Sequence, residues 1–457
     1  MKSIIRRFKG SRTIPQVVAI CIGSLSLLTA CVQYAWTSPY IPIITSEDFP
    51  GNITFEEASY FTVIPPLTAI GLCAVFSKLA DRIGRKRVLI LSGPVHFAAY
   101  VLIYFGRTVT PFYISRFLSG LGDAILWASL PVYVAEISEP HVRGTWGNVP
   151  AISGYVGQVL INVLGSYLHL QTSTILSAIV PVVFCCAFAF MPESPYFLLA
   201  RGRHEEAQKS LRLLRGGQNC DDEYKQLTRD VNRQLSETGT LKDLFLIKSN
   251  RRALFIAVGA RAASQMSGIA AFTVHTQYLF EQAGQNISKE LSSITFSAVL
   301  LVLATLGAFY QDKFGRRPLM IGSCLGCGFI LLVETVYFYL NDKTSVDLSG
   351  LRWVPLAGMI LYLFCFSFGL SLIPSLLVGE LFSTSIKANA MIVTNIFFDG
   401  FICVITKVFQ TLTYNFGLYV PFLIFTVSCF INAIRSYLFL LETRGKTLEE
   451  IQQMLKK

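Results

Sequence analysis

The sequence predicts an all-α membrane protein with twelve transmembrane helices. Hydrophobic residues make up 53% of its 457 residues and charged residues only 15%, whereas soluble domains carry about 25% charged residues. The apolar residues also occur in runs long enough to cross about 30 Å of hydrocarbon as helices. Because backbone groups in lipid must be hydrogen-bonded within their own segment, we expect these runs to be helical.

Short polar segments separate the predicted spans. The first run is too long for a signal peptide, lacks a clear small-residue cleavage site and is followed by eleven others, so we expect it to remain as the first helix. The twelve predicted spans lie at 14–36, 59–79, 88–106, 111–135, 147–168, 173–191, 253–279, 291–310, 318–340, 354–379, 388–409 and 417–440.

The distribution of basic residues predicts the orientation. A formal net charge of +11 is compatible with nucleic-acid binding, but most Lys and Arg residues gather on one side of the predicted spans. Only Arg107, Lys289, Lys343 and Arg352 fall in loops on the other side. Because positively charged loops stay in the cytoplasm, we expect both termini to be cytoplasmic, and we expect no nucleic-acid partner.

Two glycosylation motifs agree with this topology. NIT begins at Asn52 and NIS at Asn286. Both fall in loops that the charge distribution places outside, where glycosylation occurs. We therefore expect a multi-pass protein of the plasma membrane, in contact with the lipid bilayer and monomeric.

The cysteines do not indicate a metal site. All of the eleven cysteines except Cys220 lie in predicted helices, where cysteine packs as a small apolar residue. The CLGC segment at 324–327 has metal-ligand spacing, but a zinc site must supply further ligands, and the neighbouring sequence offers none. We expect no metal and no cofactor.

A charged motif occurs twice, half a chain apart. LADRIGRKRV begins at Leu79 and YQDKFGRRPL at Tyr310, after the second and eighth runs. Similar pairs of charged segments follow the fourth and tenth runs and the sixth and twelfth runs. These echoes predict a six-helix N-terminal half at 1–200, a cytoplasmic linker with amphipathic helices at 201–252, and a six-helix C-terminal half with a short tail at 253–457. Repeats of this kind recur in transporters, with the substrate site between the halves.

The repeated charges fall at the cytoplasmic ends of the predicted helices. A single partly exposed ion pair contributes about 0–1 kcal/mol, but a network can bias an equilibrium between two conformations. The positive-inside rule explains the bases but not the acids paired with them. We therefore expect an inner gate formed by Asp81, Arg85, Glu136, Arg143, Glu193, Asp312, Arg316, Glu380 and Lys387.

These motifs resemble the sugar porter family of the major facilitator superfamily. The resemblance covers nearly the whole chain and includes RFLSGLG, PVYVAEISEPHVRG, MPESPYFLLARGRHEEA, GELFSTSIKA and ETRGKTLEEIQ. WTSPYIP at 36–42 and TKVFQTL at 406–412 are similar to the insect facilitated trehalose transporter branch. The resemblance implies the twelve-helix major facilitator fold, alternating access, and passive or proton-coupled transport of a small-molecule sugar. It also implies the inner-gate role of the repeated charges.

The expected sugar site departs from the family pattern. Sugar porters usually carry QQxSGxNA in the seventh helix, whose amides bind sugar hydroxyls, whereas this chain reads SQMSGIAA. Gln265 is retained, but Ser264 and Ala270 replace two amides, and Ser375 stands where a tryptophan usually follows the proline of the tenth helix. Losing such groups leaves buried substrate hydroxyls unpaired and costs affinity. The motifs therefore predict the fold but do not identify the substrate.

Ionisable residues within the predicted helices extend the candidate site. Arg116 and Asp123 are seven residues apart and share a helix face, and Asp399 lies near the middle of the eleventh helix. Such residues tend to face the bundle interior and to be functional, whereas the lone His96 has no visible metal or base partner and is expected to be a packing or gate residue. The predicted substrate-binding residues are Gln265, Ser264, Phe272, His275, Ser375, Asp399, Arg116, Asp123, Gln33 and Thr37.

The first helix bears on the mode of transport. Proton-coupled sugar porters usually have an Asp there, whereas 14–36 contains no Asp or Glu, and Gln33 or Thr37 stands at the equivalent position. This favours facilitated diffusion of trehalose or a hexose. Asp123 and Asp399 keep a proton-coupled carrier of a sugar or another small polar solute as an alternative.

Two other classes fit less well. A non-transporting sugar sensor usually has a long cytoplasmic tail, whereas only 441–457 follow the last predicted helix. The sequence has no Walker loop and no nucleophile-and-base constellation outside the membrane. We therefore expect neither an ATP-driven pump nor an enzyme.

Overall fold

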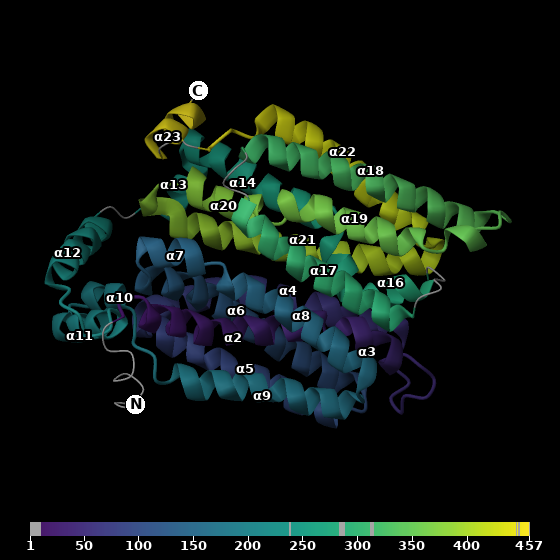
Figure 1. Ribbon diagram of the computed structural model, residues 1–457, viewed down its shortest axis with the longest axis horizontal. Helices are drawn as coiled ribbons and strands as arrows, with labels where there is room; N and C mark the ends of the chain where they lie inside the picture. Colours follow the sequence, from purple (N-terminus) through teal and green to yellow (C-terminus); the bar gives the residue numbers. More distant parts are fainter. Residues whose placement is uncertain are drawn as a thin grey trace. The chain divides into compact units, whose positions relative to one another are not determined.

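The computed structural model describes residues 11–236, 239–282, 288–310, 315–444, 446 and 448–456. These residues form helices joined by turns (Figure 1). The helices are α2 (Ile14–Ala35), α3 (Thr37–Ile44), α4 (Phe55–Ile83), α5 (Arg85–Phe105), α6 (Val109–Ile137), α7 (Pro140–Trp146), α8 (Val149–Tyr167), α9 (Leu170–Phe188), α10 (Pro195–Ala200), α11 (His204–Leu214), α12 (Asp221–Ser236), α13 (Leu241–Leu246), α14 (Lys248–Met266), α15 (Ile269–Val274), α16 (Thr276–Gln282), α17 (Lys289–Tyr310), α18 (Arg316–Lys343), the 3-10 helix η2 (Ser349–Leu351), α19 (Val354–Phe368), α20 (Ile373–Leu381), α21 (Thr384–Phe416), α22 (Tyr419–Phe439) and α23 (Leu448–Lys456).

Eleven helical stretches of the described chain are long and apolar enough to cross a membrane. Each overlaps one of the predicted spans, and of the twelve only the seventh is missing from the set. The stretches are Ile14–Ile44, Phe55–Ile83, Arg85–Phe105, Val109–Ile137, Pro140–Tyr167, Leu170–Phe188, Lys289–Gly307, Arg316–Lys343, Ser349–Leu381, Ile386–Phe416 and Tyr419–Phe439.

The seventh predicted span is broken into α14, α15 and α16. Gly268 separates α14 from α15 with a φ of +95°, in the left-handed region. Residues other than glycine rarely adopt this backbone conformation. His275, with a φ of −121°, separates α15 from α16. The continuous helix expected over 253–279 is therefore three helices, because two residues between its ends leave helical geometry.

The chain divides into two compact units, which are described separately here. Unit 1 contains Met1–Gln33, Thr68–Gly157 and His169–Thr238, and unit 2 contains Tyr34–Leu67, Gln158–Leu168 and Gly239–Lys457. The boundaries pass through α4 and α8, so the first part of α4 and the last part of α8 belong to unit 2. The division into two six-helix halves stays a prediction.

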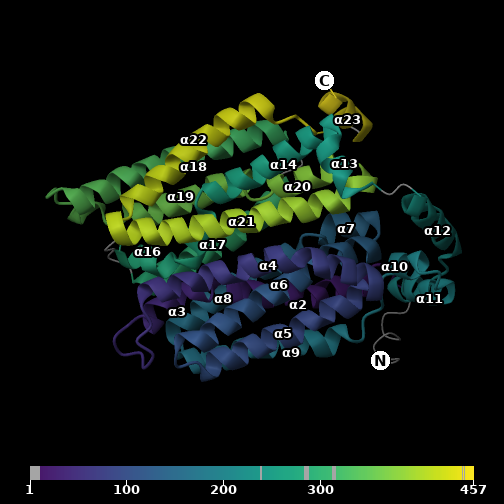
Figure 2. The ribbon, with the colours of Figure 1, turned by 180° about the vertical axis from the view of Figure 1, so that it is seen from behind.

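Close helix packing characterises unit 1. In it α5 runs beside α6 and α9 (Figures 1 and 2). A Cβ at Gly93 of α5 would lie 2.1 Å from the Cys185 Sγ of α9. A glycine is needed at this contact, as is usual where membrane helices pack closely.

Aromatic side chains form the interior of unit 2. The ring of Phe272 in α15 lies 5.2–6.2 Å, centroid to centroid, from the rings of Tyr362, Phe409, Phe422 and Phe425. Edge-on contacts of this kind contribute beyond simple burial of apolar area. The cluster therefore holds α15 against α19, α21 and α22.

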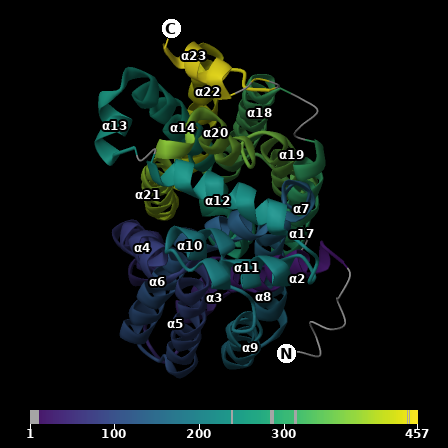
Figure 3. The same ribbon diagram turned by 90° about the vertical axis from the view of Figure 1, so that its left-hand side faces the viewer.

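The part of the predicted linker at 201–252 that belongs to unit 1 contains α11 and α12. These helices and the preceding α10 lie at the end of unit 1 where α5 begins (Figures 1 and 3). The remainder of the predicted linker contains α13 and the start of α14 in unit 2. Ala207, Leu211 and Leu214 of α11 are buried, while its charged residues are largely exposed. This part of the linker is helical and amphipathic, as the spacing of its leucines predicts.

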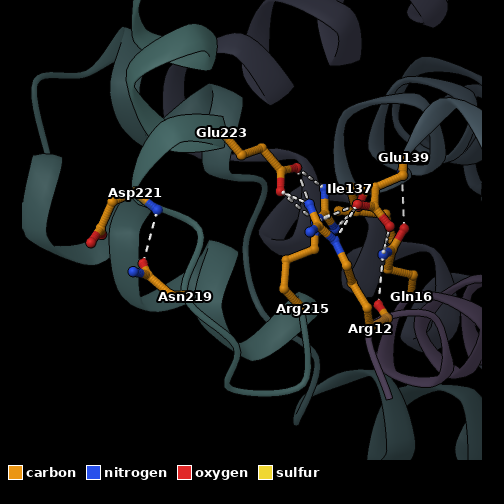
Figure 4. Close-up of polar contacts among 8 residues, drawn as sticks. All are labelled: Arg12, Gln16, Ile137, Glu139, Arg215, Asn219, Asp221 and Glu223. Carbon is orange, nitrogen blue, oxygen red and sulfur yellow. Dashed lines mark hydrogen bonds and ion pairs between the residues drawn. The ribbon is translucent and has the colours of Figure 1, made fainter. Parts of the chain in front are cut away.

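Four charged side chains fasten this linker to the start of α2 and the α6–α7 junction (Figure 4). The buried Arg215 has its Nη2 2.5 Å from Glu223 Oε1 and its Nε 3.6 Å from Glu139 Oε1. Arg12 contacts the same two carboxylates, at 2.5 Å from Glu139 and 2.7 Å from Glu223. Gln16 Nε2 also donates to Glu139 Oε2 at 3.0 Å. Three distant segments of unit 1 therefore share one ion network.

The surroundings of Glu139 lower its pKa. Burial alone would raise the pKa, but the hydrogen bond from Gln16 and the charges of Arg215 and Arg12 outweigh it. A lowered pKa in the folded chain means that the carboxylate stabilises the fold at pH values above its unfolded pKa. This contribution is lost as the pH falls through the folded value.

Replacing Arg215 with alanine should destabilise unit 1, because it removes the buried centre of this network. A hydrogen bond to a charged group contributes about 1.5–3 kcal/mol. The matched control is Arg212→Ala, since Arg212 is half-exposed and pairs with Asp221 at 3.4 Å, and such pairs contribute about 0–1 kcal/mol. Thermal unfolding of the purified variants checks this, and equal melting temperatures for both would contradict it.

Candidate functional site

The first charged motif forms a network at the start of α5 in unit 1. Arg85 Nε lies 3.1 Å from Glu136 Oε2, and Arg85 Nη2 lies 3.0 Å from Asp81 Oδ1. Glu193 accepts a hydrogen bond from the Lys86 backbone N–H at 2.9 Å. A carboxylate at a helix N-terminus is favourable because unpaired N–H groups and the helix dipole converge there.

The second motif forms the same arrangement in unit 2. Arg316 Nη2 lies 3.2 Å from Glu380 Oε1. Glu442 accepts from the backbone N–H groups of Arg316 and Arg317 at 2.9 and 3.1 Å, at the start of α18. Burial alone would raise the pKa of Glu442, but backbone hydrogen bonds from Arg444, Arg316 and Arg317 lower it. In each unit an arginine pairs with an acid of another helix, Glu136 or Glu380, and a second acid, Glu193 or Glu442, caps a helix.

The remaining predicted gate residues are placed differently. Arg143 of α7 is exposed, and Lys387 Nζ donates to the Gly379 carbonyl at 3.2 Å. Asp312 lies outside the described residues. Each of the contacts given above lies within one unit, so a gate acting between the two halves stays a prediction.

Gln265 lies next to the break in the seventh span. Its side chain is 5% exposed, and its amide forms no hydrogen bond with any other residue that the structure describes. Ser264, its neighbour in α14, is also buried. A buried amide normally has a partner, so an unpaired one beside a helix break is available to bind a ligand.

His275 and Thr37 lie near the second break. The imidazole of His275 stacks on Phe409 with ring centroids 5.6 Å apart, and its buried Nε2 has no partner within the described chain. Thr37 Oγ1 of α3 donates to the Val274 carbonyl at 3.0 Å. Thr37 therefore already has a partner, whereas the His275 Nε2 is free to accept or donate.

Phe272 and Ser375 have contrasting surroundings. Phe272 is fully buried within the aromatic cluster described above. Ser375 of α20 is exposed, at the position where the expected platform tryptophan is missing.

Asp399 has a cationic neighbour that the sequence analysis did not pair with it. The Asp399 charge acts on Arg261 of α14, and the Arg261 guanidinium carbon lies 5.0 Å from the centroid of the Phe398 ring. Arg261 stands three residues before Ser264, on the same helix face. Arg261 is a charged residue inside the predicted seventh span, and this feature of the sequence could have indicated a pairing with an acid of another helix.

Gln33, Arg116, Asp123 and His96 meet in unit 1. Arg116 Nη1 donates to the Gln33 carbonyl at 2.8 Å, and Gln33 Nε2 donates to the His96 carbonyl at 3.2 Å. His96 Nε2 lies 3.4 Å from Asp123 Oδ1. The sequence analysis found no partner for His96, because the acid lies on the next helix, 27 residues further along the chain.

The glycosylation motifs differ in what the structure describes. Asn52 is exposed in the connection between α3 and α4, with a φ of +45°. Asn286 lies outside the described residues. Use of either motif stays a prediction.

Curated relatives resemble this chain along nearly its whole length. It is 32% identical over 445 residues to the trehalose transporter 1 of Drosophila melanogaster, which covers 96% of this chain and 52% of the relative. It is 29% identical over 448 residues to a facilitated trehalose transporter of Culex quinquefasciatus, which covers 97% of this chain and 86% of the relative. The chain spans about half the length of the Drosophila relatives that it matches.

Solved structures confirm the predicted fold. The inward-open structure of the xylose transporter XylE from E. coli matches with a TM-score of 0.78 at 19% identity, over 95% of this chain and 98% of the other. The major facilitator superfamily proton:xylose symporter XylE bound to 6-bromo-6-deoxy-D-glucose matches with a TM-score of 0.77 at 20% identity, over 97% and 100%.

The family model described as sugar (and other) transporter matches residues 46–455. This family consists of transporters rather than enzymes. Together with the all-helical fold and the repeated charged motifs, the match shows that the chain belongs to the sugar porter family of the major facilitator superfamily.

Proposed function

We propose that this chain carries trehalose or a hexose across the membrane by alternating access. The observation that carries the proposal is the broken seventh span, where the unpaired amide of Gln265 lies beside the left-handed Gly268. Discontinuous helices in membrane proteins are tolerated where they line a cavity or a binding site. The similarity to trehalose transporters supports trehalose as the first candidate substrate.

Sugar recognition in this proposal depends on few neutral polar groups. Gln265 supplies the amide that the family pattern leads us to expect, while Ser264 and the exposed Ser375 supply short hydroxyls. His275 Nε2 is a further buried polar atom with no partner in the part of the chain that the structure describes. Such a site makes fewer hydrogen bonds to a sugar than one with three amides, so we expect modest affinity.

The proposed mode is facilitated diffusion. The helix α2 contains no acidic residue, so it offers no carboxylate to carry a proton. The second candidate is proton-coupled transport, which the contact between His96 and Asp123 favours. Because α2 lacks an acid, we place facilitated diffusion first.

The orientation and the gate belong to the same proposal. We place both termini in the cytoplasm on the charge distribution, and we propose a monomer in the plasma membrane. The networks centred on Arg85 and Arg316 would then lie on the cytoplasmic side. Their equivalent pairing supports a role for both in stabilising the conformation in which that side is closed.

Uptake should not depend on a proton gradient. The measurement is uptake of radiolabelled trehalose and glucose by cells expressing the protein, at acidic and neutral external pH, with and without a protonophore. Facilitated diffusion predicts saturable uptake that the protonophore leaves unchanged. Uptake that collapses with the protonophore would replace facilitated diffusion by the second candidate, and Asp123→Asn and Asp399→Asn would identify the acid involved.

A further inference from the structure

An imidazole and a carboxylate meet inside the helix bundle of unit 1. His96 of α5 is 1% exposed, and the side chain of Asp123 of α6 is 19% exposed. His96 Nε2 lies 3.4 Å from Asp123 Oδ1. A Cβ at Gly122 would lie 2.5 Å from His96 Cε1, so α6 carries a glycine where the ring packs. The pair is therefore held in place by the fold.

A further residue of α6 and one residue of a third helix, α2, fix this pair. The fully buried Arg116 donates to the Gln33 carbonyl of α2 at 2.8 Å, and its charge acts on Asp123. Gln33 Nε2 in turn donates to the His96 carbonyl at 3.2 Å. Three helices thus hold one cation, one acid and one imidazole together.

Ser119 Oγ beside the pair is buried and has no hydrogen-bond partner among the described residues. The buried Tyr100 hydroxyl interacts with the side chain of Gln33. Ser119 lies three residues after Arg116 and four before Asp123, which places all three on one face of α6. Buried polar atoms without a protein partner are generally satisfied by water, and water chains are the usual route for protons.

Few ionisable side chains surround His96. On α5 the nearest ionisable side chain is Tyr100, and α6 contributes Arg116 and Asp123. The helix α9 contributes only Cys185, opposite Gly93, and α2 contains no acid, lysine, arginine or histidine. One negative and one positive charge therefore face the imidazole, and they balance when the imidazole is neutral.

We propose that His96 and Asp123 form a proton-binding site that makes transport by this chain pH-dependent. A hydronium ion transfers its proton to an imidazole nitrogen of His96, so that one O–H bond breaks, one N–H bond forms and water is released. Histidine is the side chain that ordinarily titrates near neutral pH. The partial exposure of Asp123 supplies the aqueous path, because an ionisable side chain in a membrane helix faces the protein interior or a water-filled space rather than lipid.

The bound proton adds one positive charge to a cluster that is otherwise neutral. In a carrier that alternates between two conformations, a ligand shifts the equilibrium only when it binds one conformation better than the other. Protonation of a buried group is more favourable in a conformation in which water reaches the group than in one in which water is excluded. The proton therefore binds one conformation better than the other if the two expose the cluster to water to different degrees. The proton then changes the rate of exchange even without a gradient.

The first test is sugar exchange in liposomes that contain the purified protein, with equal pH on both sides. We expect exchange of radiolabelled trehalose or glucose to change at least about threefold between about pH 5.5 and about pH 8, through one transition near the histidine range. His96→Gln and the isosteric Asp123→Asn should each abolish the transition. The control is His169→Gln, since His169 is exposed before α9 and lies outside the cluster.

The second test needs no substrate, so it stays informative if neither sugar is exchanged. The chain has five histidines, and NMR of the protein with labelled histidine identifies His96 by the signal that His96→Gln removes. The signal is followed between about pH 5 and about pH 8.5, and we expect it to change with pH and to respond differently in Asp123→Asn. A His96 signal that is constant over this range, or an exchange transition unchanged in both variants, would overturn the proposal.

Discussion

Replacing Gln265 with alanine should weaken substrate binding about tenfold, which corresponds to about 1.4 kcal/mol. Gln265 is buried, and its amide forms no hydrogen bond within the described part of the chain. Removing it strands the substrate hydroxyl that it would bind, and a stranded polar group costs about 1–3 kcal/mol. The measurement is the concentration dependence of uptake of the best transported sugar, at matched surface expression.

The control for this prediction is a buried glutamine with a structural hydrogen bond. Gln410 Nε2 of α21 donates to the Phe55 carbonyl at 3.0 Å, as polar side chains do when they hold membrane helices together. Gln410→Ala should lower thermal stability and leave the affinity within about twofold. If Gln265→Ala behaves like Gln410→Ala, then Gln265 is a packing residue and the sugar is recognised elsewhere.

Restoration provides the converse result. Ser264→Gln combined with Ala270→Asn returns the two amides that the family pattern leads us to expect in this segment. If the site is a reduced sugar site, the double variant should bind trehalose or glucose more tightly than the wild type, because each added amide gains a net hydrogen bond of about 0.5–1.5 kcal/mol. Tighter binding in the double variant and weaker binding in Gln265→Ala together would locate the site.

Replacing Gly268 with alanine should abolish transport and lower stability. The φ of +95° at Gly268 costs an L-residue about 1–2 kcal/mol. The new Cβ would also lie 2.5 Å from Phe425 Cδ2 and 2.8 Å from Phe272 Cζ, and overpacking of this kind costs about 1–3 kcal/mol. Relief requires α15 to move relative to α14, which displaces the residues on both sides of the break.

Gly322→Ala is the matched control for Gly268→Ala. Gly322 lies inside α18, and a Cβ at this position would meet nothing within 4 Å. Alanine is preferred over glycine by about 0.5–1 kcal/mol in a helix interior, so this variant should be at least as stable as the wild type. Thermal unfolding and sugar uptake are measured on both variants, and we expect loss of stability and of transport in Gly268→Ala only. A fully active Gly268→Ala would show that transport does not need the helix break.

The membrane fold was predictable because lipid imposes strict rules. Backbone groups that water cannot reach must pair within a helix, so runs of apolar residues such as 417–440 predicted α22 at Tyr419–Phe439 closely. The repeated charged motifs also predicted ion pairs at the helix ends. Arg85 pairs with Glu136 through its Nε and Arg316 with Glu380 through its Nη2, and duplicated sequence at equivalent helix ends predicts such equivalent pairs.

The break in the seventh span was not predictable from composition. The residues at 264–271 are mostly small or apolar and fit a continuous helix. The left-handed conformation of Gly268 depends on the rings of Phe425 and Phe272, which leave no room for a side chain. Such a conformation is decided by packing between distant segments, and a single sequence does not display that packing.

The partners of the polar residues were also beyond the sequence. Spacing along a helix placed Arg116 and Asp123 on one face, but it cannot show which residue of a neighbouring helix lies opposite. His96 gains Asp123 as a neighbour through the packing of α5 on α6. The four aromatic rings that surround Phe272 come from α19, α21 and α22 and could not be inferred from its position in the sequence, and its role in a sugar site stays a prediction.

The most direct test of sugar transport is counterflow with purified protein. Liposomes that contain the protein are loaded with unlabelled trehalose or glucose and diluted into a trace of the same labelled sugar. A carrier that alternates between two conformations exchanges the internal sugar for the labelled one, so we predict a transient accumulation of label that is reduced in Gln265→Ala. The absence of accumulation for trehalose, glucose and other hexoses, with protein that unfolds cooperatively on heating, would contradict the proposal that this chain carries a sugar.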